Sequence, residues 1–176
     1  MAASSARSKA SERSKAISRR RHLARLAAVQ ALYQVEMTGQ RPEAVVLEFL
    51  THRRREEIEG ISLEDLDQSL FNELVVTISK DPAGLDALLS GALSADWPVE
   101  RLERLLRIIF RLGVYELRFR PKVPVGVIIN ECVDLAHAYY EGKEPGMVNG
   151  VLDRLARELR DGGPAAGQEE PSASQG

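Results

Sequence analysis

The sequence predicts an all-α domain of about seven helices. Apolar residues recur at spacings of three and four over most of residues 18–160, which is the period of one helix face. No stretch alternates apolar and polar residues for long enough to predict a strand. Capping residues followed by proline, such as Asp81-Pro82, divide the pattern into separate helices.

The first two helices are expected in the N-terminal third of the chain. Ser18 is a suitable N-cap for a helix that reaches about Met37 and ends before Gly39. Pro42 fits the first turn of a second helix, and the charged run 53–60 predicts a loop. The face of the first helix that we expect to be buried holds five apolar residues: Ala24, Ala28, Ala31, Leu32 and Val35.

Three start signals follow in the middle of the chain. Ser62 and Asp65 resemble a weak capping box that opens a third helix reaching Ile78. Asp81-Pro82 starts a short fourth helix. The triplet Asp96-Trp97-Pro98 starts a long fifth helix over about 99–119.

Two further helices complete the predicted domain. The segment 125–139 places apolar residues on one face and has the clearest amphipathic pattern in the chain. The triplet Glu144-Pro145-Gly146 then opens a last helix, which continues to about residue 160.

The two ends of the chain differ from the domain in composition and charge. Residues 1–17 hold little that is apolar and predict a disordered basic arm. Residues 161–176 are rich in Gly, Pro and Ala and predict a disordered acidic tail. The net charge is +7 over residues 1–25, although it is -2 over the whole chain. A basic arm on an acidic body is typical of nucleic-acid binding.

Several classes of protein are excluded by composition. No apolar run is long enough for a membrane helix, and no secretory signal begins the chain, so we expect a cytoplasmic protein. The single cysteine, Cys132, excludes an internal disulfide. The three histidines lie far apart, so we expect no metal site and no cofactor. No phosphate loop, nucleophile elbow or HExxH motif occurs, so we expect no catalytic residues and no enzyme activity.

Arginines at the start of the first helix are the main candidates for nucleic-acid binding. Arg20, Arg21 and Arg25 follow directly from the basic arm, and guanidinium groups both contact phosphates and stack on bases. The alternative is a solvated helix start with a solubilising tail. Cations at a helix N-terminus oppose the helix dipole, which makes that alternative less favourable.

Polar residues elsewhere have structural interpretations. The arginines of the long fifth helix are expected to pair mostly with nearby glutamates, with Arg111 as the exception. Asn130 and Glu131 are expected to cap a helix end or to bridge to an arginine. Cys132 lies on the apolar face of its helix and is expected to be an inert core thiol.

Five segments together resemble the NusB family of bacterial transcription antitermination factors. Their order and spacing span nearly all of residues 18–160. They are ARLAAVQALYQ (24–34), WPVERL (97–102), FRLGVYEL (110–117), VPVGVIINECVDLAH (123–137) and VNGVLDRLAREL (148–159).

The resemblance implies both a fold and a function. The family is non-enzymatic and consists of two three-helix bundles plus a further helix. It binds the boxA RNA of antitermination transcripts, together with NusE, a small-subunit ribosomal protein. The resemblance therefore implies support of ribosomal RNA transcription, with an indirect link to the RNA polymerase elongation complex.

The resemblance also assigns residues by position. The RNA-binding assignments are Arg19, Arg20, Arg21, Arg25, Gln30, Arg111 and Asn149. Tyr33 falls where the family has a tyrosine at the NusE-facing surface. The first helix start, the fifth helix and the Val-Asn-Gly turn are expected to meet on one side of the molecule. Leu106 and Met147 depart from the family, which often has an acidic and an aromatic residue there.

Three alternatives stay open at this point. Some members self-associate, so the chain could be a dimerisation module that forms a homodimer and does not bind RNA directly. A NusB-like module also begins an RNA cytosine methyltransferase family, but this chain has no room for the cofactor-binding domain. A small hydrolase would need a catalytic cluster that the sequence does not offer.

Overall fold

The computed structural model describes residues 2–58 and 60–161, with side chains from Arg7 onward. These residues form seven α-helices, two short 3-10 helices and one two-residue hairpin. The prediction of an all-α domain of about seven helices is confirmed. The predicted acidic tail, 161–176, lies outside the described residues except for Asp161.

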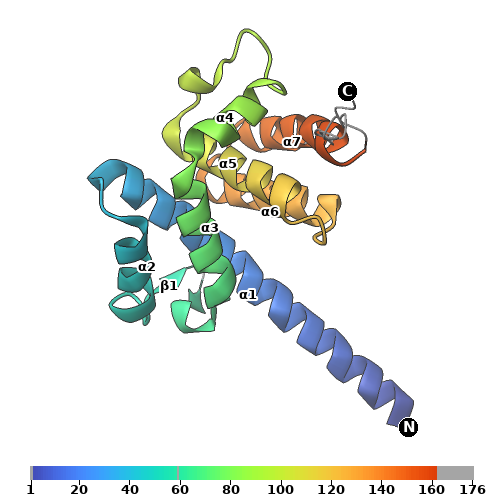
Figure 1. Cartoon of the computed structure of the whole chain (residues 1–176). Helices are drawn as coiled ribbons and strands as arrows, with labels where there is room; N and C mark the ends of the chain where they lie inside the picture. Colours follow the sequence, from blue (N-terminus) through green and yellow to red (C-terminus); the bar gives the residue numbers. More distant parts are fainter. Residues whose placement is uncertain (1, 59, 162–176) are drawn as a thin grey trace, which may run out of the picture.

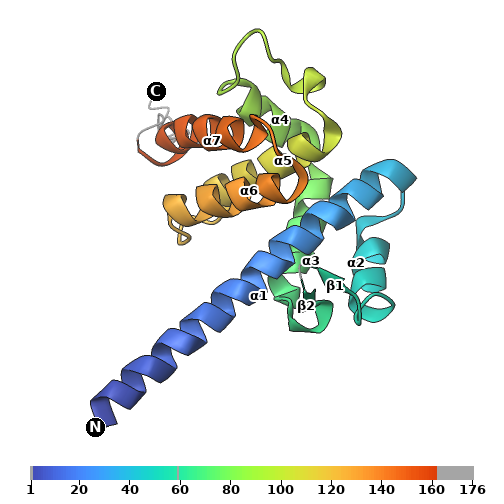
Figure 2. The same ribbon diagram turned by 180° about the vertical axis from the view of Figure 1, so that it is seen from behind.

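Helix α1 (Ala2–Thr38) is the longest element, and its N-terminal half projects away from the body (Figures 1 and 2). Residues 2–17 were expected to be an arm without regular structure; instead they continue the helix through the predicted cap at Ser18. This segment has no glycine or proline and is rich in alanine, and extending an existing helix costs less than nucleating a new one. Residues 7–21 are exposed, as expected for a segment with little apolar surface to bury.

Helices α2 (Pro42–Thr51) and α3 (Gln68–Lys80) pack against α1 and form the first three-helix bundle. The predicted loop at 53–60 contains part of a small antiparallel hairpin, β1 (Glu57–Ile58) with β2 (Ile61–Ser62). Gly60 turns this hairpin with a φ of 72°, which a residue with a side chain rarely adopts.

The start of α3 differs from the sequence prediction. Ser62 caps the short helix η1 (Leu63–Asp65), because its hydroxyl accepts a bond from the Glu64 N–H at 3.2 Å. Asp67 caps α3 itself by accepting from the Leu70 N–H at 3.0 Å. The predicted cap Ser62 therefore opens η1, and Asp67, which the sequence prediction did not include, opens α3.

Helices α5 (Arg104–Phe119), α6 (Val125–Tyr139) and α7 (Glu144–Arg160) form the second bundle, and α4 (Pro82–Ser90) packs on α5. Asp81 caps α4 as predicted, accepting from the Gly84 N–H at 2.9 Å. The fifth helix begins later than expected. A short helix η2 (Val99–Arg101) comes first, and Glu103 then caps α5.

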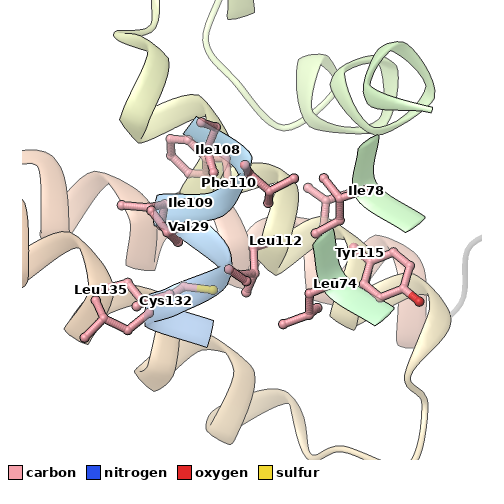
Figure 3. Packing of buried hydrophobic residues seen from close by; sticks show 14 of the residues in the cluster. Val29, Leu74, Ile78, Ile108, Ile109, Phe110, Leu112, Tyr115, Cys132 and Leu135 are labelled. Carbon is pink, nitrogen blue, oxygen red and sulfur yellow. The ribbon is translucent and has the colours of Figure 1, made fainter. Parts of the chain in front are cut away.

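The core lies where α1 of the first bundle packs against α5 of the second. Residues 23–29 of α1 are all buried, as are residues 108–117 of α5. Figure 3 shows side chains of α5 meeting Val29 of α1, Leu74 of α3 and Cys132 of α6. Each helix therefore buries its whole circumference in the middle of the molecule, rather than the single stripe that the sequence predicted.

Gly113 lets the helices of the second bundle approach each other closely. A Cβ at this position would lie 2.7 Å from Leu152 Cδ1 of α7 and 3.1 Å from Cys132 Sγ of α6. Among the described residues, no helix is long and apolar enough to cross a membrane.

Candidate nucleic-acid interface

The N-terminal half of α1 presents a dense group of exposed cations. No acidic residue occurs in the first turn of the helix, and Glu12 is the one carboxylate before residue 22. A projecting helix of this charge raises the local concentration of anions and attracts nucleic-acid phosphates. The exposed cations are Arg7, Lys9, Arg13, Lys15, Arg19, Arg20 and Arg21.

Two of these arginines contact residues just before the start of α3. The Arg20 Nε–H donates to the Asp65 carbonyl oxygen at 3.0 Å. The Arg21 Nε lies 3.9 Å from an Asp67 carboxylate oxygen, and the Arg21 side chain remains 50% exposed. These contacts place both guanidinium groups beside the body while leaving N–H donors for a ligand.

A groove of about 470 Å³ lies beside these arginines, between α1 and the hairpin. Its charged lining residues are Arg19 and Arg20 on one side and Glu57 and Asp65 on the other. Guanidinium groups donate to phosphates and carboxylates accept from base amino groups, so the groove offers both kinds of contact to RNA.

Arg25, which the family resemblance assigns to RNA binding, is not part of the exposed group. Its Nε–H and Nη2–H donate to the two carboxylate oxygens of Glu116, at 2.7 and 2.9 Å. The Arg25 side chain is 4% exposed and that of Glu116 is fully buried. Burial lowers the pKa of Arg25, but the Glu116 carboxylate outweighs it and the net pKa is raised. Arg25 is therefore a buried ion-pair residue that ties α1 to α5.

Glu131 extends this buried network, as its predicted structural role requires. One of its carboxylate oxygens lies 3.5 Å from the Arg25 Nη1 and 2.9 Å from the His22 Nδ1. Glu131 thus bridges to an arginine, while its neighbour Asn130 is exposed. Cys132 is fully buried, and burial raises the pKa of its thiol far above the usual range, as expected of an inert core thiol.

Arg111, which the family resemblance also assigns to RNA binding, is bound to partners within the chain. Its Nε–H and Nη2–H donate to the Asp86 carboxylate, each at 2.7 Å, and its Nη1–H donates to Glu36 at 2.5 Å. The Asp86 hydrogen bonds are the main cause of a raised Arg111 pKa. Arg111 joins α5 to α4 and to α1. Its partner on α1, Glu36, lies 16 positions after Arg20, which is about 24 Å along the helix at about 1.5 Å per residue.

The other assigned residues lie in separate places. Gln30 is half-buried on α1. Asn149 is exposed, but it lies within α7 rather than on a turn. In both views α6 lies between α1 and α7 (Figures 1 and 2).

Tyr33 lies towards the opposite end of α1 from the cations. It is 38% exposed, and Met37, one turn further on, is 54% exposed. The Arg104 guanidinium contacts the Met37 sulfur and lies 3.5 Å from Glu36. Tyr33 and Met37 thus form a small apolar surface bordered by charged groups, which suits a protein contact.

Sequence reasoning missed the hairpin groove and the burial of two arginines. A signal for the burial was present, because Arg25 and Arg111 are each flanked on both sides by apolar residues. Among the described residues, no group of three or more His, Cys, Asp or Glu side chains is arranged to hold a metal ion.

Comparison with known proteins assigns the fold to a family. The family model described as the NusB family matches residues 22–157. The chain belongs to the NusB family. It is similar to transcription antitermination protein NusB of Nitrobacter hamburgensis, with 46% identity over 143 residues, 81% of this chain and 89% of that protein. The same protein of Rhodopseudomonas palustris is 44% identical over 141 residues, 80% of this chain and 83% of the relative.

Two solved NusB structures support the same assignment. One is the crystal structure of the antitermination factors NusB and NusE in complex with double-stranded RNA. It has a TM-score of 0.64 and 26% identity, and the match covers 79% of this chain and 97% of that chain. The other is NusB of T. maritima, with a TM-score of 0.54 and 31% identity over 78% of this chain and 90% of that one.

Proposed function

We propose that this NusB-family chain is a transcription antitermination factor that binds boxA-like single-stranded RNA together with NusE. The observation that carries the proposal is the exposed cationic start of α1 on a fold whose solved relative is a complex with NusE and RNA. The chain would support ribosomal RNA transcription in the cytoplasm, through indirect contact with the RNA polymerase elongation complex. It acts by binding and catalyses no reaction.

The proposed RNA contacts begin with Arg19, Arg20 and Arg21. Their guanidinium groups are exposed beside the hairpin groove and can neutralise phosphates, which sets affinity without reading sequence. Gln30 and Asn149 are proposed to contribute polar contacts to base edges. Arg25 and Arg111 support the site from within the fold, because their N–H donors are already bound to carboxylates.

The proposed NusE contact is the apolar surface of Tyr33. Tyr33 lies thirteen positions after Arg20 on α1, which is about 20 Å at about 1.5 Å per residue. The RNA-binding arginines and the partner surface therefore lie at different ends of one rigid helix. Both ligands can bind at the same time without competing for side chains.

The RNA contact is tested by the salt dependence of binding. Each phosphate neutralised on a single strand contributes about -0.7 to the slope of log K against log salt. Replacing Arg19, Arg20 and Arg21 with Ala should reduce the magnitude of that slope by about 1.4 to 2.1, for two or three lost contacts. Fluorescence anisotropy with boxA RNA measures it.

A charge-matched variant serves as the control for this test. Arg41, Arg101 and Arg157 are exposed arginines outside α1, and replacing all three with Ala removes the same charge. This control should keep the wild-type slope. Equal slopes for the two triple variants would remove α1 from the RNA site and favour the dimerisation module without direct RNA binding.

The partner contact is tested with two exposed apolar residues. Tyr33→Ala should weaken NusE binding by at least about tenfold, or about 1.4 kcal/mol, because interface tyrosines often dominate binding energy. Leu47→Ala is the matched control, since Leu47 is 62% exposed on α2 and should leave NusE affinity unchanged. Calorimetry that shows the same NusE affinity for Tyr33→Ala and wild type would exclude Tyr33 from the interface.

A further inference from the structure

The N-terminal part of α1 lies outside the residues that the NusB family model matches. The family match begins at residue 22, whereas α1 begins at Ala2. Residues 7–21 are exposed and project from the body (Figures 1 and 2). This extension therefore adds a surface to the chain rather than support to its core.

Because the extension is helical, its side chains have fixed directions. Lys9, Arg13 and Arg20 are separated by four and seven residues, so they lie on one face of a helix with 3.6 residues per turn. Ala16 lies on the same face, between Arg13 and Arg20. We call the face formed by Lys9, Arg13 and Arg20 the cationic stripe.

The cationic stripe leads into the groove between α1 and the hairpin. Ala16 and Arg20 belong to the stripe face and also line that groove. A strand of RNA that follows the stripe therefore meets the body at a groove with guanidinium and carboxylate groups. The stripe and the groove make one continuous path along α1.

Charge within the extension favours a polyanion as the ligand. Lys9 and Arg13 are like charges one turn apart, as are Lys15 and Arg19, and such pairs weaken a helix. The cations near the helix N-terminus also oppose the helix dipole. Bound phosphates relieve both effects, so the helical form of the extension is the form that an RNA backbone stabilises.

Composition argues against a lipid surface as the ligand. Ile17 is the only large aliphatic residue between Arg7 and Arg21, so the extension has no apolar face to insert into a bilayer. The cations instead have the sign of charge that a chain of phosphates binds.

We propose that the N-terminal extension of α1 binds the phosphate backbone of RNA flanking boxA, through the cationic stripe of Lys9, Arg13 and Arg20. The proposal rests on the proposed function, because it assigns a second, sequence-independent contact to the same RNA. It predicts that the extension increases the affinity for RNA that continues beyond boxA and leaves the affinity for boxA alone unchanged.

The test compares the full chain with a variant lacking residues 2–16, on two RNAs. One RNA is an oligonucleotide holding boxA alone, and the other is the same boxA flanked by polyuridine. On the flanked RNA the deletion should reduce the slope of log K against log salt by about 1.4 to 2.1, for two or three lost phosphate contacts. The advantage of the full chain should then shrink by about 7- to 18-fold between 50 and 200 mM salt. On boxA alone the two proteins should bind equally.

Two double variants test the stripe itself. Lys9→Ala with Arg13→Ala removes two cations from the stripe, and Arg7→Ala with Lys15→Ala removes two cations from other faces. The first pair should reduce the slope on flanked RNA by about 1.4, and the second pair by less than half as much. Neither pair touches the core, so both proteins should fold.

Three results would overturn the inference. They are an unchanged slope on flanked RNA after the deletion, equal effects of the two double variants, and a deletion that lowers NusE affinity while RNA binding is unchanged. The last result would make the extension a protein contact. Failure of the full chain to distinguish boxA from scrambled RNA would instead overturn the proposed function.

Discussion

Removing the charge of Glu116 tests the structural role of Arg25. Glu116→Gln keeps the size of the side chain but leaves the Arg25 guanidinium without its main counterion in the core. Both side chains are at most 4% exposed, so solvent screens the pair little. Breaking a buried ion pair typically costs about 3 to 5 kcal/mol. We expect about 3 kcal/mol, since Glu131 lies 3.5 Å from the Arg25 Nη1 and compensates in part.

Urea unfolding measures this cost directly. With a slope of about 2 kcal/mol per molar urea, a loss of about 3 kcal/mol lowers the midpoint by about 1.5 M. Replacing both partners, by Arg25→Met with Glu116→Leu, should recover most of the loss because no uncompensated charge remains. Asp153→Asn in the exposed Arg157–Asp153 pair is the surface control and should cost less than about 0.5 kcal/mol.

Two outcomes would refute the reasoning about Arg25. A cost below about 1 kcal/mol for Glu116→Gln would mean that the pair is not held in a low-dielectric core. A reduced salt slope for RNA binding by the folded Arg25→Met, Glu116→Leu protein would return Arg25 to the RNA site.

Three further predictions follow from buried or partly buried groups. The Cys132 thiol should react with a thiol reagent only at the rate of unfolding, because burial raises its pKa; rapid modification of the native protein would contradict its burial. Arg111→Ala should cost about 2 kcal/mol in urea unfolding and leave the RNA salt slope unchanged, and a changed slope would make Arg111 an RNA contact. Burial raises the pKa of Glu103, but the Tyr140 hydroxyl and backbone N–H groups outweigh it and the net pKa falls below 4.5. The charged form therefore stabilises the fold above about pH 4.5, and this contribution is lost as the pH falls through the lowered pKa. The difference in stability between wild type and Glu103→Gln should shrink below that pH, and a constant difference would contradict the assignment.

The fold could be predicted because helix starts are local signals. Pro42 begins α2 and Asp81 caps α4, as the sequence indicated. The burial of α1 and α5 on all sides could not be predicted, because it arises from packing between two bundles. The hairpin was missed because strands of two residues are too short to show alternation.

In the candidate site, too, local features could be predicted from the sequence and tertiary contacts could not. The exposure of Arg19, Arg20 and Arg21 follows from a local lack of apolar residues, and the sequence predicted it. The burial of Arg25 depends on Glu116, which is 91 residues away in the chain, and that of Arg111 on Asp86, 25 residues away. Tertiary pairing of this kind leaves no periodic signal, so an arginine that binds RNA and one that pairs in the core look alike in the sequence.

The most direct test of RNA binding with NusE is the affinity of the full chain for boxA and scrambled RNA, each measured with and without NusE. Fluorescence anisotropy at one fixed salt concentration gives all four dissociation constants. The proposed function predicts that boxA binds more tightly than scrambled RNA and that NusE increases this difference. Equal affinities for the two RNAs, unchanged by NusE, would contradict it.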